Sequence, residues 1–240
     1  MRLRVVGCSP AWNDPGGAQS GYLLEESGRG RLLLDCGPGV LLRMRQEEPW
    51  PRVDAIAITH FHLDHWGDLV PWSFGMLFGP GRNNGPPPEL WLPPDGKETV
   101  RSLDSVLSTF GILEAFSVRE YAEGVPFRAA GFDVTAVRTV HYERRSFGFR
   151  VAGEGRTLAY TGDSAPTPAL AELARDADLF VCEATLAQPE PGLRGHLTLD
   201  EALDAYQASG ARRLLVVHRP TELPVPEGIE RAHDGLELDV

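Results

Sequence analysis

Six consecutive residues bring three imidazoles and a carboxylate together: His60, Phe61, His62, Leu63, Asp64 and His65. They directly follow residues 55–59, an apolar run that predicts a buried strand. Imidazole and carboxylate are the ligands that zinc and similar borderline ions prefer. Because a strand end is rigid on one side and open on the other, the run predicts a metal site at the edge of a sheet. The alternative is a surface loop in which the histidines have no common role.

The size and charge of the chain limit its organisation and its partners. No Gly/Ser linker, repeat or charge block divides the 240 residues, so we expect a single domain over residues 1–240 with a substantial core. The formal net charge of −11 argues against binding nucleic acid by overall attraction. Nucleic acid would need a local basic patch or the metals themselves, and it is therefore a disfavoured partner.

The cysteines and the N-terminus indicate the compartment. Cys8, Cys36 and Cys182 are an odd number without CxxC spacing, so we expect buried thiols rather than disulfides or a cysteine zinc site. The N-terminus does not show the long apolar stretch of a signal peptide, and no run approaches the roughly 18 apolar residues that span a bilayer. We expect a cytoplasmic protein that does not enter membranes.

The apolar pattern alternates between strands and helices in both halves of the chain. Short apolar runs bounded by turn residues predict strands over 3–7, 20–25, 31–35, 55–58, 90–92, 132–137, 146–151, 157–160, 179–182 and 213–217. Helical spacing predicts helices over 40–46, 66–78, 96–109, 167–175 and 199–209, with a loop over 79–88. This order favours two sheets with helices on their outer faces.

Polar residues that bind metals or transfer protons lie where the predicted strands and helices end. Four of them follow strands in the second half of the chain, and a fifth precedes the last helix: His141, Asp163, Glu183, His218 and His196. Taken singly, each is equally well explained as a hydrogen-bonded turn residue. Together they indicate a common site at one edge of the sheets.

The order HxHxDH, then His141, Asp163 and His218, resembles the metallo-β-lactamase superfamily of binuclear hydrolases. Residues 35–39 also match the early aspartate–glycine turn of that family, so the resemblance covers nearly the whole chain. It implies an α+β fold, a four-layer αββα sandwich (the metallo-β-lactamase fold), with the metals at the joint edge of the two sheets. It also implies that Asp35 supports the histidine run and does not bind metal directly.

The resemblance implies two divalent ions and the residues that hold them. The ligands of the first ion would be His60, His62 and His141, those of the second would be Asp64, His65 and His218, and Asp163 would bridge the two. A water between the ions would become a hydroxide near neutral pH. His62 stands where the related diiron oxygen-reducing enzymes have glutamate, which favours hydrolysis with Zn²⁺, with Mn²⁺ or iron as alternatives.

Two later segments resemble ribonuclease Z and its relatives. Residues 182–185, Cys-Glu-Ala-Thr, match their glutamate segment, and residues 195–198, Gly-His-Leu-Thr, match their GHST-type motif. The resemblance implies that His196 donates a proton to the leaving alkoxide while Glu183 orients it, and Asp64 is a further catalytic candidate that orients the nucleophile. The alternative is that Glu183 caps a turn and His196 makes a structural hydrogen bond.

The same comparison limits the substrate. The stretch between His141 and Asp163 is too short for the arm with which ribonuclease Z grips transfer RNA, and Leu197 replaces the serine of GHST. We therefore expect a phosphodiesterase acting on a small or nucleotide-like phosphodiester. Alternatives are a carboxyl-ester, lactone or thioester hydrolase, a tRNA 3′-processing endoribonuclease, and a metal-stabilised binding protein without activity.

Two further features are open in the sequence. Arginines near the expected site would suit phosphate oxygens or be solvated surface groups: Arg144, Arg145 and Arg194. The aromatic-rich segment over residues 66–91 fits a substrate pocket, a homodimer interface or core packing equally well.

Overall fold

The computed structural model describes residues 1–107 and 111–240, whose strands form two seven-stranded sheets. The first sheet has the order β14-β1-β2-β3-β4-β5-β6. Its strands are β1 (Arg2–Gly7), β2 (Gly21–Glu25), β3 (Leu32–Leu34), β4 (Ala55–Ala57), β5 (Glu89–Leu92), β6 (Ser117–Glu120) and β14 (Glu237–Asp239). The pairs from β14 to β3 are antiparallel, and those from β3 to β6 are parallel.

The second sheet mirrors this plan with the order β13-β12-β11-β10-β9-β8-β7. Its strands are β7 (Phe127–Ala129), β8 (Phe132–His141), β9 (Arg144–Ala152), β10 (Thr157–Tyr160), β11 (Leu179–Glu183), β12 (Leu214–Val217) and β13 (Glu230–Arg231). The strands from β7 to β10 pair antiparallel, and those from β10 to β13 pair parallel. Each sheet thus has a parallel half whose strands all end at the same edge.

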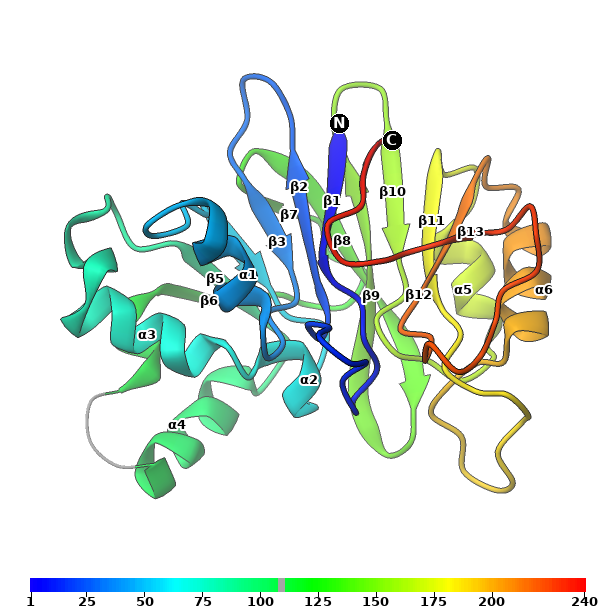
Figure 1. Ribbon diagram of the computed structural model, residues 1–240, viewed down its shortest axis with the longest axis horizontal. Helices are drawn as coiled ribbons and strands as arrows, with labels where there is room; N and C mark the ends of the chain where they lie inside the picture. The colour runs from blue at the N-terminus through cyan, green and yellow to red at the C-terminus, as the bar shows by residue number, and fades with distance from the viewer. Residues whose placement is uncertain (108–110) are drawn as a thin grey trace.

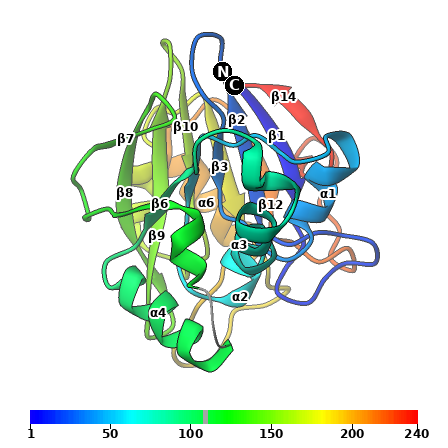
Figure 2. The same cartoon turned by 90° about the vertical axis from the view of Figure 1, so that its left-hand side faces the viewer.

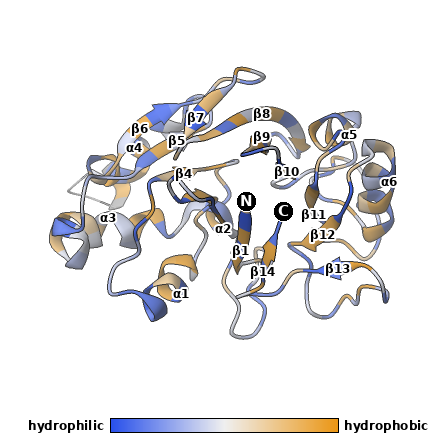
Figure 3. Cartoon of the chain, turned by 90° about the horizontal axis from the view of Figure 1, so that it is seen from above, coloured by the Kyte–Doolittle hydropathy of each residue, from blue (hydrophilic) through white to orange (hydrophobic). Residues whose placement is uncertain are grey.

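Helices cover the outer face of each sheet (Figures 1 and 3). The first sheet carries α1 (Val40–Glu47), α2 (Leu63–Trp66), α3 (Leu69–Phe78) and α4 (Gly96–Leu107), with short 3₁₀ turns η1 (Pro80–Asn83) and η2 (Ile112–Ala115). The second sheet carries α5 (Pro168–Leu173) and α6 (Leu199–Ser209). The N- and C-terminal strands β1 and β14 lie side by side in the first sheet (Figure 2).

Three apolar clusters hold the four layers together. The central cluster joins the two sheets and includes Leu34, Phe132 and Phe149. A second joins the first sheet to its helices, and a third, which contains Phe180, joins the second sheet to α5 and α6. The layers are therefore helix, sheet, sheet and helix, which confirms the predicted αββα sandwich.

All the strands predicted from the sequence are present, but some elements differ in extent. The helix predicted over 66–78 is two helices, because the chain turns between α2 and α3 at Gly67 and Asp68. The helix predicted over 167–175 ends earlier, at Leu173. Residues 108 and 109, in the helix predicted over 96–109, lie outside the described residues. The predicted loop over 79–88 includes η1.

The aromatic segment over residues 66–91 divides between core and surface. Trp66 and Trp72 are buried in the cluster between the first sheet and its helices, which supports core packing for this part. Phe74 and Phe78 lie on the outer face of α3 and are 47% and 66% exposed. A homodimer interface on that face stays a prediction.

The cysteine prediction is confirmed. Cys8, Cys36 and Cys182 are buried free thiols, and burial raises the pKa of each. Among the described residues, no helix has both the length and the apolar character needed to cross a membrane.

Candidate metal centre

The predicted site residues meet at one edge of the two sheets, where the parallel strands end. His60 follows β4 in the first sheet, and Asp163 follows β10 in the second. His218 follows β12, while His141 and Glu183 are the last residues of β8 and β11. Because carboxyl ends of parallel strands share an edge, residues far apart in the chain converge there.

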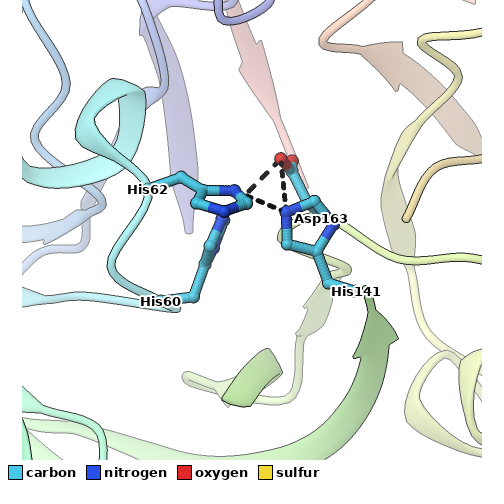
Figure 4. A group of neighbouring side chains, drawn as sticks. All are labelled: His60, His62, His141 and Asp163. Carbon is cyan, nitrogen blue, oxygen red and sulfur yellow. Dashed lines mark hydrogen bonds and ion pairs between the residues drawn. The ribbon is translucent and has the colours of Figure 1, made fainter. Parts of the chain in front are cut away.

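Three groups of side chains bring metal-ligating atoms within 4.8 Å of one another: two consist of predicted ligands, and the third is Glu183, His196 and His218. The first group is His60, His62, His141 and Asp163 (Figure 4). The second is Asp64, His65, Asp163 and His218. Asp163 belongs to both of these groups, so the structure brings together all seven residues that the sequence indicated as ligands. We call these seven residues the ligand cluster.

Asp163 lies at the centre of this cluster. Its Oδ2 atom is 3.7 Å from Nε2 of His60 and 3.8 Å from Nε2 of His141. The same oxygen is 3.2 Å from Nε2 of His65, and Oδ1 is 3.8 Å from Nε2 of His218. Four imidazoles from both sheets therefore aim the same ring nitrogen at one carboxylate.

Asp35, at the end of β3, holds two of these imidazoles. Its Oδ2 accepts a hydrogen bond of 2.7 Å from Nδ1 of His65. Thr59 donates its hydroxyl to the same carboxylate at 2.9 Å and lies 3.1 Å from Nδ1 of His60, from which it can accept. Tyr160 also donates to Asp35. Asp35 thus fixes the tautomers of both rings so that Nε2 faces the cluster, as expected for a support residue.

Glu183 has the same arrangement on the second sheet. Its Oε1 accepts a hydrogen bond of 2.8 Å from Nδ1 of His196. Its Oε2 accepts the hydroxyl of Thr185 at 2.7 Å, and that hydroxyl lies 2.9 Å from Nδ1 of His218. One buried carboxylate therefore orients both His196 and a residue of the ligand cluster.

The loop before α6 supports the imidazole of His141. Nδ1 of His141 donates to the carbonyl of Gly195 at 2.7 Å. Glu190 accepts from the backbone of Gly195 and from the hydroxyl of Tyr142, the latter at 2.7 Å. A Cβ on Gly195 would lie 2.1 Å from the Tyr142 ring, so only glycine lets the loop approach this closely.

The residues present fit divalent ions. Nε2 of His60, Nε2 of His65 and Oδ1 of Asp163 are buried and have no hydrogen-bond partner within the described part of the chain. Buried polar atoms normally have hydrogen-bond partners, so these three atoms are available to a cation. Nitrogen and carboxylate oxygen are also the donor set that zinc prefers. The geometry and the donor chemistry agree on a metal site.

Electrostatics keep three of the rings in the form that binds metals. Burial lowers the pKa of His60 well below its usual value, that of His62 to about 4, and that of His141. These imidazoles are neutral at pH 7 and offer a lone pair. Burial alone would raise the pKa of Asp64 and Asp163, but the neighbouring histidines hold both low, so the carboxylates are ionised.

His196 behaves in the opposite way. Burial would lower its pKa, but the charge and hydrogen bond of Glu183 outweigh that effect and raise the pKa to about 9. The ring therefore carries a proton at pH 7 beside the ligand cluster. A protonated imidazole at this position can donate to an oxygen that leaves the substrate.

The backbone at this edge adopts unusual conformations. Asp35, Tyr142 and His218 have positive φ angles of 59°, 49° and 51°. Such angles are costly for residues with a side chain and tend to cluster at functional sites. Gly37 is required for a different reason, because a Cβ there would lie 1.9 Å from the carbonyl of Asp64. The turn after β3 thus packs directly against α2.

Sequence reasoning missed several supporting residues: Thr59, Thr185, Tyr142 and Glu190. Thr59 directly precedes the first histidine and Thr185 lies two residues after Glu183, so adjacency was the only available signal. Two of the three arginines considered for phosphate are already paired. Arg145 forms an ion pair with Asp95 at 2.6 Å, and Arg194 binds Glu201.

The chain is similar in sequence to proteins with names of metallo-hydrolases and ribonucleases. The chain is 30% identical over 225 residues to "Probable metallo-hydrolase YhfI" of Bacillus subtilis (strain 168), covering 92% of this chain and 87% of that protein. It is 28% identical to "Ribonuclease Z" of Myxococcus xanthus (strain DK1622), covering 78% and 76% of the two chains. Both relatives have names of hydrolytic enzymes.

Solved structures share the fold. The crystal structure of YhfI from Bacillus subtilis matches with a TM-score of 0.85 and 25% identity, covering 99% of this chain and 98% of that chain. The short form of human tRNase Z matches with a TM-score of 0.77 and 22% identity, covering 100% and 99%. The second likeness supports the fold alone.

Fold and site together define a metallo-hydrolase with histidine and aspartate clusters that can bind metal. The model of the beta-lactamase superfamily domain matches residues 30–219. The chain therefore belongs to the beta-lactamase superfamily and has its metallo-β-lactamase fold, which confirms the resemblance seen in the sequence.

Proposed function

We propose that this protein is a phosphodiesterase that acts on a small or nucleotide-like phosphodiester. The observation that carries the proposal is the His196–Glu183 pair beside the ligand cluster. Because Nδ1 of His196 donates to Glu183 at 2.8 Å, Nε2 is the ring atom left to protonate a leaving oxygen. An alkoxide leaving group needs such a proton, since it is a strong base.

In this proposal, two divalent ions, with zinc favoured, share the cluster. His60, His62 and His141 would hold one, Asp64, His65 and His218 would hold the other, and Asp163 would be shared by both sets. When bound, the ions would lower the pKa of water and neutralise charge on phosphoryl oxygens. Asp64, whose Oδ2 is 3.1 Å from Nε2 of His218, would also orient the attacking water.

The small size of the substrate follows from the hairpin between β8 and β9. The turn consists only of Tyr142 and Glu143, and His141 pairs directly with Arg144 across it. No arm extends from this edge between His141 and Asp163. With the net charge of −11, this favours a small diester over transfer RNA.

The test compares two diesters that differ in their leaving group. Purified protein loaded with zinc or manganese is assayed on bis(p-nitrophenyl) phosphate, whose leaving group needs no proton, and on a dinucleoside monophosphate, whose leaving group is an alkoxide. We expect metal-dependent turnover of both. His196→Ala should lower kcat about 100-fold on the alkoxide substrate and much less on the nitrophenolate substrate.

Two outcomes count against the proposal. One is the absence of metal-stimulated turnover of any phosphodiester. The other is equal loss on both substrates in His196→Ala, which would indicate a structural role for the pair. Turnover of thioesters or lactones that survives in Glu183→Gln and His196→Ala would favour the carboxyl-ester, lactone or thioester alternative.

A further inference from the structure

A cleft of about 200 Å³ opens beside the ligand cluster, outside the residues assigned above. Its lining residue Phe61 lies between His60 and His62 in the chain, so the cleft adjoins the ligand cluster. The end of β5, the start of α4 and the β8–β9 hairpin form its other walls. Its lining residues are Phe61, Pro93, Pro94, Asp95, Thr99 and the pair Arg144 and Arg145.

Arg144 connects this cleft to the metal centre. It pairs with His141 across the antiparallel strands β8 and β9. Residues directly opposite each other in such a pair project from the same face, with Cβ atoms about 5 Å apart. The side chain of Arg144 therefore leaves the sheet on the face that carries His141 towards the ligand cluster.

The guanidinium of Arg144 has no partner among the described side chains. It has no hydrogen bond, ion pair or ring contact with any of the described residues. The carboxylate of Asp95 does not neutralise it, because Arg145 binds that carboxylate at 2.6 Å. The charges of Arg145 and Asp95 cancel, so the cleft keeps the single positive charge of Arg144 in a protein of net charge −11.

The opposite wall is apolar and rigid. The Phe61 ring contacts Trp66 edge-on, with centroids 5.8 Å apart. A Cβ on Gly96 would lie 3.2 Å from the Phe61 ring, so α4 packs closely against it. Pro93 and Pro94 have fixed φ angles. Such a wall excludes water on one side and strengthens a charge pair made by the exposed guanidinium.

We propose that this cleft binds a second anionic group of the substrate, one that lies beyond the phosphodiester held at the metal centre, and that Arg144 pairs with it. This inference rests on the proposed function, because that function puts the reacting phosphorus at the ligand cluster. It specifies the substrate further, as a diester that carries an additional phosphate. A guanidinium binds phosphate through two parallel hydrogen bonds, which suits this role better than a neutral ester group.

The kinetic test uses two substrates that differ by one phosphate. These are thymidine 5′-(p-nitrophenyl phosphate) and the same compound with a 3′-phosphate, both assayed with zinc-loaded protein. Arg144→Gln should raise KM about tenfold for the 3′-phosphorylated substrate and less than about twofold for the other, with kcat little changed. Arg175→Gln removes the same charge from an exposed position after α5 and should leave both KM values unchanged.

Binding of thymidine 3′,5′-bisphosphate, measured by calorimetry on the zinc-loaded protein, keeps the proposal testable if neither substrate turns over. We expect Arg144→Gln to weaken this binding about tenfold relative to wild type and Arg175→Gln. The same KM change for both substrates, or bisphosphate binding that is unaffected by Arg144→Gln, overturns the second-anion site. Absence of turnover with intact Arg144-dependent binding would instead contradict the proposed phosphodiesterase and leave the site standing.

Discussion

The carboxylate of Asp35 accepts a hydrogen bond of 2.7 Å from Nδ1 of His65, and both side chains are fully buried. Asp35 reaches His60 as well, through the hydroxyl of Thr59. Glu183 repeats the pattern on the other sheet, where it binds His196 directly and reaches His218 through Thr185. Each sheet thus contributes one buried carboxylate and one threonine that together set the orientation of two imidazoles.

Replacing Asp35 by asparagine should weaken metal binding. The amide cannot accept from His65, Thr59 and Tyr160 as the carboxylate does, so the His65 ring loses its fixed tautomer. We expect zinc affinity to fall about 10- to 100-fold, measured by competition with a chromophoric chelator. Asp133→Asn, on an exposed position of β8, is the matched control and should bind zinc as wild type does. A folded Asp35→Asn protein with unchanged affinity would show that Asp35 does not act through the ligands.

Thr185→Val tests the contact through which Glu183 reaches His218. Valine has nearly the same shape but leaves Nδ1 of His218 without the hydroxyl that lies 2.9 Å away. An unsatisfied buried group costs about 1–3 kcal/mol, and here the cost falls on a proposed ligand. We expect zinc affinity to fall about tenfold, with His196, the proposed proton donor, still bound to Glu183. Equal zinc affinity in wild type and variant would mean that the Thr185 hydroxyl is not needed to orient His218.

The ligand cluster was predictable from the sequence because strand ends are predictable. His60, Asp163 and His218 each follow an apolar run whose type the local pattern fixes, and parallel strands bring such ends to one edge. The supporting contacts were not predictable in the same way. Tyr142 and Glu190 meet only after the loop before α6 folds back on the β8–β9 hairpin, and nothing in either segment specifies that contact.

The strands likewise divide into those that a local sequence pattern predicts and those that it does not. The strands predicted over 157–160 and 55–58 are buried apolar runs, which local pattern detects well. β13 has only the two residues Glu230 and Arg231, and β6 carries mostly exposed side chains, so neither has an apolar signal. Such edge strands form because a neighbouring strand offers free hydrogen-bonding groups, a property of the assembled sheet that short polar segments do not encode.

Tyr142→Phe should separate positioning from catalysis. Phenylalanine keeps the ring against Gly195 but removes the hydrogen bond to Glu190, which in turn binds the backbone of Gly195. Because Gly195 precedes His196, we expect a several-fold loss of kcat on a diester with an alkoxide leaving group and little loss on bis(p-nitrophenyl) phosphate. Glu190→Gln leaves one acceptor oxygen for two donors, the Tyr142 hydroxyl and the Gly195 N–H, so we expect a similar several-fold loss on the alkoxide substrate. Equal losses on both substrates in Tyr142→Phe would indicate a general structural defect instead.

The last prediction concerns Asp68, whose carboxylate accepts from the backbone of Leu41 at 2.7 Å and so caps the start of α1 from outside the helix. Burial raises the pKa of Asp68 to about 6, although hydrogen bonds from Leu41 and Gly39 oppose the shift. In the unfolded chain the pKa is about 4. The folded state therefore binds the proton more tightly between about pH 4 and pH 6, and this group's contribution to stability falls as the pH rises through that window.

Asp68→Asn removes the titration while keeping an oxygen that can accept from Leu41. Relative to wild type, the free energy of unfolding of the variant should be higher at pH 8 than at pH 4.5, by on the order of 2 kcal/mol between the two conditions. Urea denaturation at both pH values, with chelator present to remove metal effects, measures this difference. A variant-to-wild-type difference that is the same at pH 4.5 and pH 8 would show that burial does not shift this carboxyl group.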